Sequence, residues 1–430
     1  MKLWQKDDKS SSELIEKFTV GNDQELDMVL AEFDVKGSLA HTQMLESIGL
    51  LTKKELHLIH SELHLILNNI KNNNFKIDEG VEDIHSQIEL MLTQKIGEVG
   101  KKIHSGRSRN DQVLTDIKLY LRYELKEIVQ LVNSLFTQLI AQSETHKNTL
   151  LPGYTHLQIA MPSSFGLWFG AYAESLVDDM ELVVAAYNVT NKNPLGSGAG
   201  YGSSFPLNRE MTTELLEFKS LNYNVVYAQM TRGKTEKIVS MALASVAATL
   251  SKLAFDMCLY MNQNFGFVSF PNELTTGSSI MPHKKNPDVF ELIRAKCNKL
   301  QALPNELTLL TNNLPSGYHR DLQLTKESLF PAIQELKSCL EMTAYMLQHI
   351  EVNSTILNDD KYKYLFSVEV VNEQVLAGIP FRDAYKNVGN AIENNSFNPS
   401  IDLKHTHTGS IGNLCNEQII QQMEALKKKF

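Results

Sequence analysis

The stretch KIVSMALASVAATLSKLAFDMCLYM, residues 237–261, is apolar on nearly all sides and is rich in alanine and serine. A helix with this composition belongs in the centre of a helix bundle, where small side chains let neighbouring backbones approach closely. The stretch therefore predicts a long central helix around which the rest of the chain is arranged.

Helical periodicity extends to other parts of the chain. Between residues 113 and 141, apolar side chains from Leu121 to Leu139 recur in steps of four and three. This mean repeat of about 3.5 residues is typical of a helix packed nearly parallel to its neighbours. Two further long helices are expected over 166–190 and 327–350. Helices of about 25 residues span roughly 35–40 Å, so we expect a mainly α chain built on an elongated bundle, with faces available to other subunits.

Domain boundaries are soft, because the sequence shows no internal repeat, low-complexity tract or linker. The first proline is Pro152, and the 430 residues include only 12 prolines, so long stretches carry no helix breaker. We expect a mainly helical N-terminal domain over 1–111, the long-helix bundle over 112–360 and a small helical C-terminal domain over 361–430.

The composition, 43% apolar and 21% charged, is that of an ordinary soluble protein. A formal net charge of −9 and the lack of an arginine-rich arm argue against a nucleic-acid partner. Four widely spaced cysteines fit free thiols in a reducing compartment. The N-terminus carries no apolar secretory segment, and prolines and polar residues interrupt the uncharged stretch 148–173. We therefore expect a cytoplasmic protein with no membrane partner.

The loop GSSIMPHKKNPD, residues 277–288, concentrates reactive side chains. Its two prolines, Pro282 and Pro287, remove backbone donors and disfavour helix. A serine such as Ser278 is a poor base unless nearby cations or donors stabilise its alkoxide, and Lys284 and the backbone amides of the loop offer both. The structural alternative is a surface loop that leads into a capped helix.

Two more polar segments carry candidate binding groups. KKIHSGRSRNDQV, residues 101–113, sets two arginines among hydroxyl and amide donors. This combination suits carboxylates, because a guanidinium group binds them at two points; the alternative is a solvated helix N-terminus. In PSGYHRDLQLTK, residues 315–326, Gln323 and Lys326 would share one helix face. They either bind a second polar end of a ligand or face water.

His156 lies in the largely apolar run LPGYTHLQIAMP, residues 151–162. We therefore expect its side chain to be shielded from bulk water. It is either a structural histidine with satisfied hydrogen bonds or a general acid–base group, and the second role requires a carboxylate to approach it.

Metal and nucleotide chemistry find little support. The residues HTHTGSIGNLC, 405–415, make a poor metal site because a fourth ligand is missing. The sequence has no phosphate-binding loop of the Gly-Lys-Ser/Thr type and no dinucleotide fingerprint. We expect neither a metal nor an organic cofactor.

Together these segments resemble the fumarase/aspartase superfamily. Its Gly-Ser-Ser-x-Met-Pro-x-Lys-x-Asn-Pro signature matches residues 277–287 at every fixed position. Within that superfamily the chain is similar to the argininosuccinate lyase family, and the matching segments occur in family order over nearly the whole chain. They are DVKGSLAH (34–41), EDIHSQIE (82–89), HSGRSRNDQV (104–113), GYTHLQIAMP (153–162), NPLGSGAG (193–200), GSSIMPHKKNPD (277–288), YHRDLQLTK (318–326) and GIPFRDAYKNVG (378–389).

The resemblance implies a carbon–nitrogen lyase of arginine biosynthesis. Such an enzyme splits argininosuccinate reversibly into L-arginine and fumarate by anti β-elimination. By this resemblance, Ser278 removes the proton from the succinyl carbon, and Lys284 and Asn286 stabilise the charge that develops. His156, paired with Glu291, assists proton transfer to the departing guanidino nitrogen, as the acid or as an orienting group.

The resemblance also implies the binding residues and the assembly. The family fold has three domains, and the long helices of four subunits form the central bundle of a homotetramer whose active sites are each assembled from three subunits. His85 and Arg232 are further expected contacts of the substrate. The succinyl carboxylates would be held by Ser108, Arg109, Asn110 and Thr155, and the arginine end by Tyr318, Gln323 and Lys326.

The chain departs from the family pattern in two places. The family's N-terminal Trp-Gly-Gly-Arg-Phe is WQKDDKS here, which keeps only Trp4, and the serine expected soon afterwards falls at Gly21 or Asp23. The family's Asp-Arg-Asp is Thr-Arg-Gly at 231–233, which keeps only Arg232. Both departures concern the amino-acid end of the pocket more than the elimination chemistry.

Two alternatives stay open at the level of sequence. One is another superfamily lyase that releases fumarate from adenylosuccinate or from a modified succinyl substrate. The other is a non-catalytic structural homologue. The chain keeps Ser278, Lys284, His156 and Glu291, and a structural role would not need them.

Overall fold

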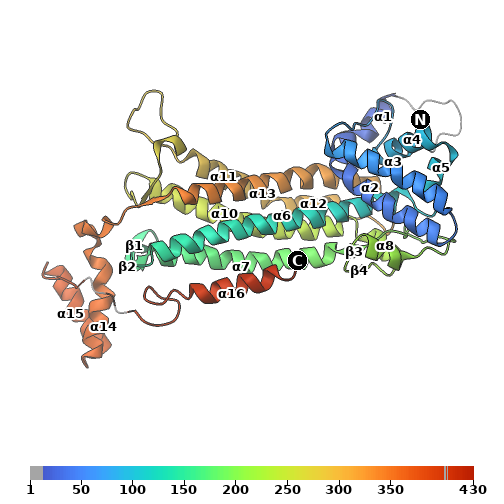
Figure 1. Cartoon of the computed structure of the whole chain (residues 1–430). Helices are drawn as coiled ribbons and strands as arrows, with labels where there is room; N and C mark the ends of the chain where they lie inside the picture. The colour runs from blue at the N-terminus through green and yellow to red at the C-terminus, as the bar shows by residue number, and fades with distance from the viewer. Residues whose placement is uncertain (1–12, 401–402, 404) are drawn as a thin grey trace. The chain divides into compact units, whose positions relative to one another are not determined.

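The computed structural model describes residues 13–400, 403 and 405–430. Trp4 and the WQKDDKS stretch therefore lie outside the described residues. The described chain is mainly helical (Figure 1) and forms two compact units. Unit 1 holds the described residues up to Ile128 together with Leu182–Ala244 and Leu300–Glu335, and unit 2 holds Val129–Glu181, Ser245–Lys299 and the described residues from Leu336 onward. The division into 1–111, 112–360 and 361–430 stays a prediction.

Four long helices each contribute residues to both units: α6 (Arg109–Thr145), α7 (Phe165–Thr190), α10 (Lys234–Met261) and α13 (Thr325–Gln348). Of the remaining elements, α2 and α3 are also long, with 25 and 19 residues, and the others are shorter. Unit 1 also contains α1 (Glu13–Val20), α2 (Asp23–Ser47), α3 (Lys53–Lys71), α4 (Ile84–Ile96), α5 (Glu98–Lys101), η1 (Lys102–His104), β3 (Lys192–Asn193), α8 (Arg209–Leu215), β4 (Ser220–Leu221), α9 (Val225–Met230), α12 (Leu303–Leu310) and η3 (Arg320–Leu324). Unit 2 also contains β1 (Leu150–Thr155), β2 (Gln158–Ser164), β5 (Val268–Ser269), η2 (Asn272–Leu274), α11 (Asp288–Leu300) except its last residue, β6 (Glu351–Val352), η4 (Ile356–Asn358), η5 (Asp360–Phe366), α14 (Ser367–Leu376), α15 (Phe381–Glu393) and α16 (Asn416–Lys427).

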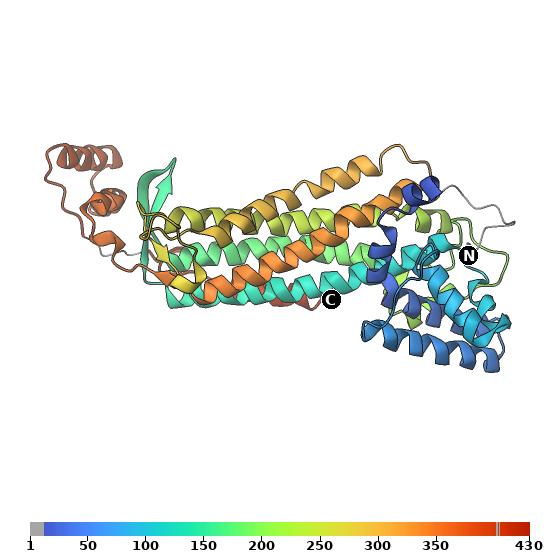
Figure 2. The ribbon, with the colours of Figure 1, turned by 90° about the horizontal axis from the view of Figure 1, so that it is seen from above.

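The long helices run side by side in both ribbon views (Figures 1 and 2). In unit 2 polar side chains link them: the Tyr172 hydroxyl of α7 donates to the Asp256 carboxylate of α10 at 2.6 Å, and Gln142 of α6 donates to the Leu347 carbonyl of α13 at 2.8 Å. These helices cover the stretches predicted to be long helices, except that α13 ends at Gln348 and the prediction ran to 350. The predicted mainly α bundle is confirmed.

Helix α10 differs from the expectation in one respect. The sequence predicts burial on nearly all sides, but Met241 and Phe255 on this helix are 47% and 52% exposed in the single chain. Ala248, exposed as well, continues the stripe because the three residues are spaced by seven. By length and composition α10 is also the one helix among the described residues that would suffice to cross a membrane, and half of its most apolar window is buried.

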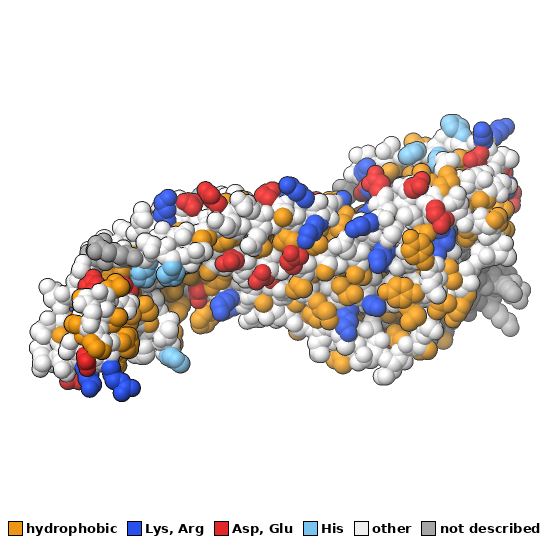
Figure 3. Space-filling model, turned by 90° about the horizontal axis from the view of Figure 1, so that it is seen from below, with side chains coloured by type: hydrophobic (Ala, Val, Ile, Leu, Met, Phe, Trp, Pro, Cys, Tyr) orange, Lys and Arg blue, Asp and Glu red, His pale blue; other side chains and the backbone are white. Residues whose placement is uncertain are grey.

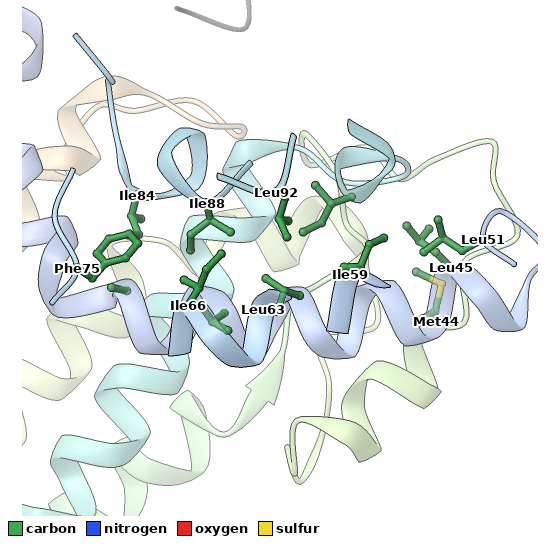
Figure 4. Packing of buried hydrophobic residues seen from close by; sticks show 13 residues of the cluster. Met44, Leu45, Leu51, Ile59, Leu63, Ile66, Phe75, Ile84, Ile88 and Leu92 are labelled. Carbon is green, nitrogen blue, oxygen red and sulfur yellow. The ribbon is translucent and has the colours of Figure 1, made fainter. Parts of the chain in front are cut away.

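The core of unit 1 is built by α2, α3 and α4 (Figure 4). Ile59, Leu63 and Ile66 lie on one face of α3, and Ile84 and Ile88 face them from α4, following the helical spacing of four and three residues. A capping box between Thr52 and Glu55 fixes the start of α3. This packing holds α2 and α4 together, and both helices carry residues of the candidate site.

Figure 3 shows how charged side chains are distributed over one face of the described chain. On the face that Figure 3 shows, acidic and basic side chains lie interspersed among exposed hydrophobic ones. This mixture of signs on one face agrees with the modest net charge of −9.

Candidate active site

The signature loop, residues 277–287, is closed at its base by backbone pairing. The Asn286 amide donates to the Thr276 carbonyl at 2.8 Å, and the Asn286 side chain donates to the Gly277 carbonyl at 3.3 Å. Helix α11 then begins at Asp288, whose carboxylate accepts a hydrogen bond from the Thr276 hydroxyl. The two ends of the loop are therefore held next to each other, and the loop leads directly into the helix that carries Glu291.

Within this loop, Ser278 is half-buried and accepts hydrogen bonds from two backbone donors. Its Oγ accepts hydrogen bonds from the backbone N–H groups of Met281 at 3.2 Å and of Ile280 at 3.4 Å. Donors aimed at one oxygen stabilise the alkoxide more than the hydroxyl, which lowers the cost of deprotonation. The role of Ser278 as the base stays a prediction, and these two contacts define the surroundings of its oxygen in this chain.

The other candidates of this loop region are accessible to water in the single chain. Lys284 and Glu291 are exposed, and Asn286 is half-buried. The Asn286 side chain is held at the base of the loop by its hydrogen bonds, whereas Lys284 lies between the two prolines and is exposed.

His156 corrects an expectation from sequence. The run 151–162 forms the antiparallel hairpin β1–β2, in which Thr155 pairs with Gln158 and leaves His156 and Leu157 as a two-residue turn. His156 is exposed in this chain, so the prediction that it is shielded from bulk water is wrong. The apolar character of the run reflects the strands of the hairpin, and the histidine is at their tip.

The turn itself is strained. His156 and Leu157 have φ values of 54° and 57°, as a two-residue turn of this type requires. Glycine and asparagine adopt this region readily, but for a large side chain such as leucine it is unfavourable. Strain of this kind persists where the surrounding structure or a function demands it. Among the described residues, His156 has no hydrogen bond with Glu291, so the single chain does not bring this pair together.

A second group of candidates lies in unit 1, at the start of α6. The Ser108 amide donates to the Asp111 carboxylate at 2.8 Å, and the Ser108 hydroxyl accepts from the Asn110 amide at 3.3 Å. The other oxygen of Asp111 accepts from the amides of Gly196 and Gly198 at 2.9 Å each. Burial raises the pKa of Asp111 to about 6, against the opposing effect of these donors. Asp111 thereby ties the glycine-rich turn to the segment that presents Arg109 and Asn110.

Arg109 is held by acidic residues in front of α4. Its guanidinium contacts the carboxylates of Asp83 at 3.0 Å and Glu82 at 3.3 Å, and it donates to the Ser86 hydroxyl at 2.9 Å. A guanidinium fixed on one side by carboxylates keeps its other donors in a defined direction. About a quarter of the Arg109 side chain, 27%, stays exposed for a ligand.

Lys326 is buried between two carboxylates. Its ammonium lies 2.6 Å from Asp27 and also pairs with Asp23. Burial, together with the charge of Asp27, raises the pKa of Asp23 against the opposing effect of Lys326. One cation and two carboxylates give this end of the cavity both signs of charge. Asp23 is one of the two candidate positions for the single serine expected from the family pattern, and Gly21 is the other.

Arg232 and Gln323 connect this region to η3. Arg232 is buried, lies 2.8 Å from Glu236 through Nε, and donates to the Leu322 carbonyl at 2.9 Å. Gln323 donates to the Val20 carbonyl at 3.2 Å and accepts from Arg320 at 3.2 Å. Arg232 thus fixes the backbone of the short helix that carries Gln323.

His85 is buried, with Nδ1 2.8 Å from the Asp34 carboxylate. Burial alone would lower the pKa of His85, but the charge and hydrogen bond of Asp34 outweigh it and raise this pKa. The Nε2 atom has no hydrogen-bond partner among the described residues. The Nε2 atom of His85 can therefore still form a hydrogen bond.

These unit 1 residues line one cavity of about 260 Å³. Outside the signature loop, the sequence predicts nine substrate-binding residues. Seven of them line this cavity, and Ser108 and Thr155 do not. The sequence had not singled out the acidic residues as binding groups, although Glu82 and Asp83 belong to a matched segment. The lining residues are Val20, Asp23, Asp27, Glu82, Asp83, His85, Arg109, Asn110, Val113, Arg232, Tyr318, Arg320, Gln323 and Lys326.

The candidates thus form two groups, one in each unit. Unit 1 holds the charged cavity. Unit 2 holds the proposed proton-transfer groups and two proposed binding residues, namely Ser278, Lys284, Asn286, Glu291, Thr155 and His156.

Known proteins place the chain among lyases. A family model described as a lyase matches residues 7–302. Argininosuccinate lyases from Parabacteroides distasonis and Bacteroides fragilis are 63% and 64% identical to the chain over 429 residues, which cover 100% of the chain and 96% of each relative. The chain belongs to the argininosuccinate lyase family.

More distant comparisons agree with this family and with the fold. The argininosuccinate lyase of Thermotoga neapolitana is 40% identical over 90% of the chain and 97% of that protein. Among solved structures, an EDDS lyase in complex with formate is similar with a TM-score of 0.80 at 21% identity, covering 98% of the chain and 91% of the other. A class II fumarase from Schistosoma mansoni gives a TM-score of 0.72 at 17% identity, with coverages of 96% and 95%. These two structures confirm the fumarase/aspartase-type fold that the signature loop predicts.

Proposed function

We propose that the chain catalyses the reversible anti β-elimination that splits argininosuccinate into L-arginine and fumarate, as a step of arginine biosynthesis. The relatives at 62–64% identity are argininosuccinate lyases, and this similarity supports the substrate. The observation that carries the chemistry is the pair of backbone donors on Ser278 Oγ. They favour ionisation of the hydroxyl in the loop that matches the superfamily signature.

In the proposed reaction, the Ser278 alkoxide removes a proton from the succinyl carbon next to the carboxylate. The electron pair of the broken C–H bond moves into that carboxylate and gives an intermediate with two negative charges on it. Lys284 and Asn286 stabilise this charge. The pair then returns to form the double bond of fumarate while the C–N bond breaks, and the guanidino nitrogen leaves with its electrons.

The leaving nitrogen needs a proton, and His156 is the group that we propose to provide it. A histidine titrates near neutral pH and can be oriented by a carboxylate, for which Glu291 is the candidate. The strained turn that holds His156 and Leu157 supports a functional role for this position, because the chain gives up stability to keep a large residue there.

The cavity of unit 1 supports the binding part of the proposal. Arg109 and Asn110, with Ser108 and Thr155, would hold the succinyl carboxylates. The charged triplet of Lys326, Asp23 and Asp27 suits the ammonium and carboxylate of the arginine end. Tyr318 and Gln323 would contact the same end, and Arg232 would act by fixing η3.

We also propose a cytoplasmic homotetramer with no nucleic-acid or membrane partner. The exposed stripe of Met241, Ala248 and Phe255 on α10 supports the assembly, since an apolar stripe on a long helix gains most when another helix covers it. Each active site would then combine residues from three subunits.

The test is the formation of fumarate from argininosuccinate, followed by its ultraviolet absorbance. Wild type is expected to be active, and Ser278→Ala is expected to lower kcat by about 10³-fold, because loss of a general base typically costs this order of rate. Binding of argininosuccinate to the variant, measured by calorimetry, should persist because the cavity residues are unchanged.

Ser279→Ala is the matched control, since it removes the neighbouring hydroxyl from the same loop. It is expected to keep most of the activity. A folded wild-type protein that forms no fumarate from argininosuccinate would contradict the proposal, and activity with adenylosuccinate instead would assign a different substrate.

A further inference from the structure

Behind the cavity of unit 1 lies a buried cluster of two carboxyl groups and one imidazole. Asp34 of α2 and Asp116 of α6 are 0% and 1% exposed, and His85 at the start of α4 is 5% exposed. The His85 Nδ1 atom lies 2.8 Å from Asp34 and 3.7 Å from Asp116. Three ionisable groups that are this close and this well shielded from water cannot all be charged at once. The contacts among them therefore decide which of them carries a proton.

Asp34 is the member that carries the negative charge. Its Oδ1 accepts from His85 Nδ1 and from the Gln112 amide at 2.6 Å. Burial alone would raise the pKa of Asp34, but His85 and Gln112, together with the charge of Arg107, outweigh it and lower this pKa. A carboxylate with two fixed donors and a cationic neighbour stays ionised even in a dry site.

Asp116 is the neutral member. Burial, and then the charge of Asp34, raise the pKa of Asp116 well above its usual value. Neither oxygen of Asp116 receives a hydrogen bond from a described donor. That arrangement suits a protonated carboxyl group that donates toward Asp34, and two adjacent carboxyl groups cannot both ionise without a large cost.

His85 connects the cluster to the cavity. It lines the cavity wall, its Nδ1 is occupied by Asp34, and Nε2 is left without a partner among the described residues. The ring is therefore held with one nitrogen toward Asp34 and the other available to a ligand. Other ionisable groups act on the cluster as well. Asp27 on α2, Asp83 in front of α4 and His104 on η1 act on His85, and Arg107 before α6 acts on Asp34.

We propose that Asp34 is a positioning residue which keeps His85 as an imidazolium, so that the Nε2–H group binds a carboxylate of the substrate. This inference rests on the proposed function, because it assumes a substrate with carboxylates. A charged donor binds a carboxylate about twice as strongly as a neutral one. Burial alone would favour the neutral ring of His85, and Asp34 counters this effect. The affinity of the cavity for a carboxylate then stays constant through neutral pH.

Asp34→Asn tests the charge while keeping the shape of the side chain. At about pH 8 the variant is expected to bind fumarate, the probe, about tenfold more weakly than wild type, because His85 becomes neutral. At about pH 6 part of this loss should be recovered, because the bound dicarboxylate favours uptake of a proton by the ring. The KM for argininosuccinate should follow the same pH profile, with a smaller change in kcat.

Asp116→Asn is the matched control, since it replaces a carboxyl group that is already neutral with a neutral amide. It is expected to change fumarate affinity by less than about twofold at either pH. If the two variants lose affinity equally, or if the Asp34→Asn loss is the same at both pH values, the residues have only a structural role and the inference is wrong.

Calorimetry of wild type gives a readout that involves no turnover and no variant. Titration of fumarate at about pH 8, in buffers of different ionisation enthalpy, is expected to show no proton uptake, because His85 is already protonated. Uptake of about one proton would overturn the inference even if the enzyme splits argininosuccinate. A chelator should leave the titration unchanged, and a chelator-dependent titration would assign the cluster to a metal instead.

Discussion

Lys118 on α6 is among the largest fully buried side chains of the described chain, although it can carry a charge. Its ammonium donates to the Asn222 side chain at 2.7 Å and to the Lys192 carbonyl at 3.3 Å. Burial lowers the pKa of Lys118 to about 7, despite the opposing effect of Glu236. Lys118 therefore changes its charge near neutral pH, far below the range of an exposed lysine.

This shift predicts how stability depends on pH. Between pH 7 and the usual lysine pKa, the unfolded chain binds a proton at Lys118 that the folded chain does not bind. The free energy of unfolding therefore rises as the pH increases through this range and falls as the pH decreases toward 7. Relative to Lys118→Met, wild type should gain about 2 kcal/mol in the free energy of unfolding from about pH 7 to about pH 9.

Urea unfolding of both proteins at the two pH values, at equal concentration, measures this difference. The unpaired Asn222 side chain costs the variant a similar amount at both pH values, so it does not affect the comparison. A difference between wild type and variant that stays constant with pH would contradict the prediction.

At the scale of residues, reactive groups that are close in the sequence could be predicted, but pairs of residues that are distant in the sequence could not. Ser278, Lys284 and Asn286 lie within one short loop, so their combination is visible in eleven consecutive residues. The partner of Lys326 is Asp27, which is 299 positions away, and His85 meets Asp34 across 51 positions. No local pattern marks such pairs, because burial and charge pairing are set by how helices pack.

At the scale of elements, the start of α7 lies unusually close to the end of α6. The Ser143 hydroxyl donates to the Gly166 carbonyl at 2.7 Å. A Cβ atom on Gly166 would lie 2.5 Å from the Cα atom of Lys147 and 2.6 Å from the Ser143 carbonyl oxygen. Both contacts are with backbone, which cannot move aside without shifting a helix.

Gly166→Ala is therefore expected to lower the free energy of unfolding by about 1–3 kcal/mol, the usual cost of overpacking. Gly389→Ala is the matched control, because Gly389 lies in the helix α15 with open space around its Cβ position. The control should be neutral or slightly stabilising, since alanine has the higher helix propensity. Equal thermal stability of the two variants would show that the α6–α7 contact relaxes freely.

The elements themselves were predictable where their pattern is long. The repeats between 113 and 141 and the apolar stretch 237–261 lie within α6 and α10, because a helix of many turns repeats its signal. The hairpin β1–β2 was missed: its strands are short, and Pro152, Pro162 and His156 hide their alternation. A short strand pair carries too little periodicity to outweigh such residues.

At the scale of the whole molecule, the division of candidate groups between two units bears on the assembly. Ser278 belongs to unit 2 and Arg109 to unit 1, and the family resemblance predicts active sites whose residues come from different subunits. Under that prediction, a subunit with a defective base can still supply a working cavity to a site whose base comes from another subunit. Two variants that are inactive alone then complement each other.

Mixing Ser278→Ala with Arg109→Ala, after joint unfolding and refolding, tests this arrangement. In randomly mixed tetramers, each site receives an intact base half of the time and an intact cavity half of the time, so roughly a quarter of wild-type activity should return. Each variant refolded alone is the control and should stay inactive. No recovery in mixtures that reach the tetrameric mass by sedimentation would mean that each site takes both groups from one chain.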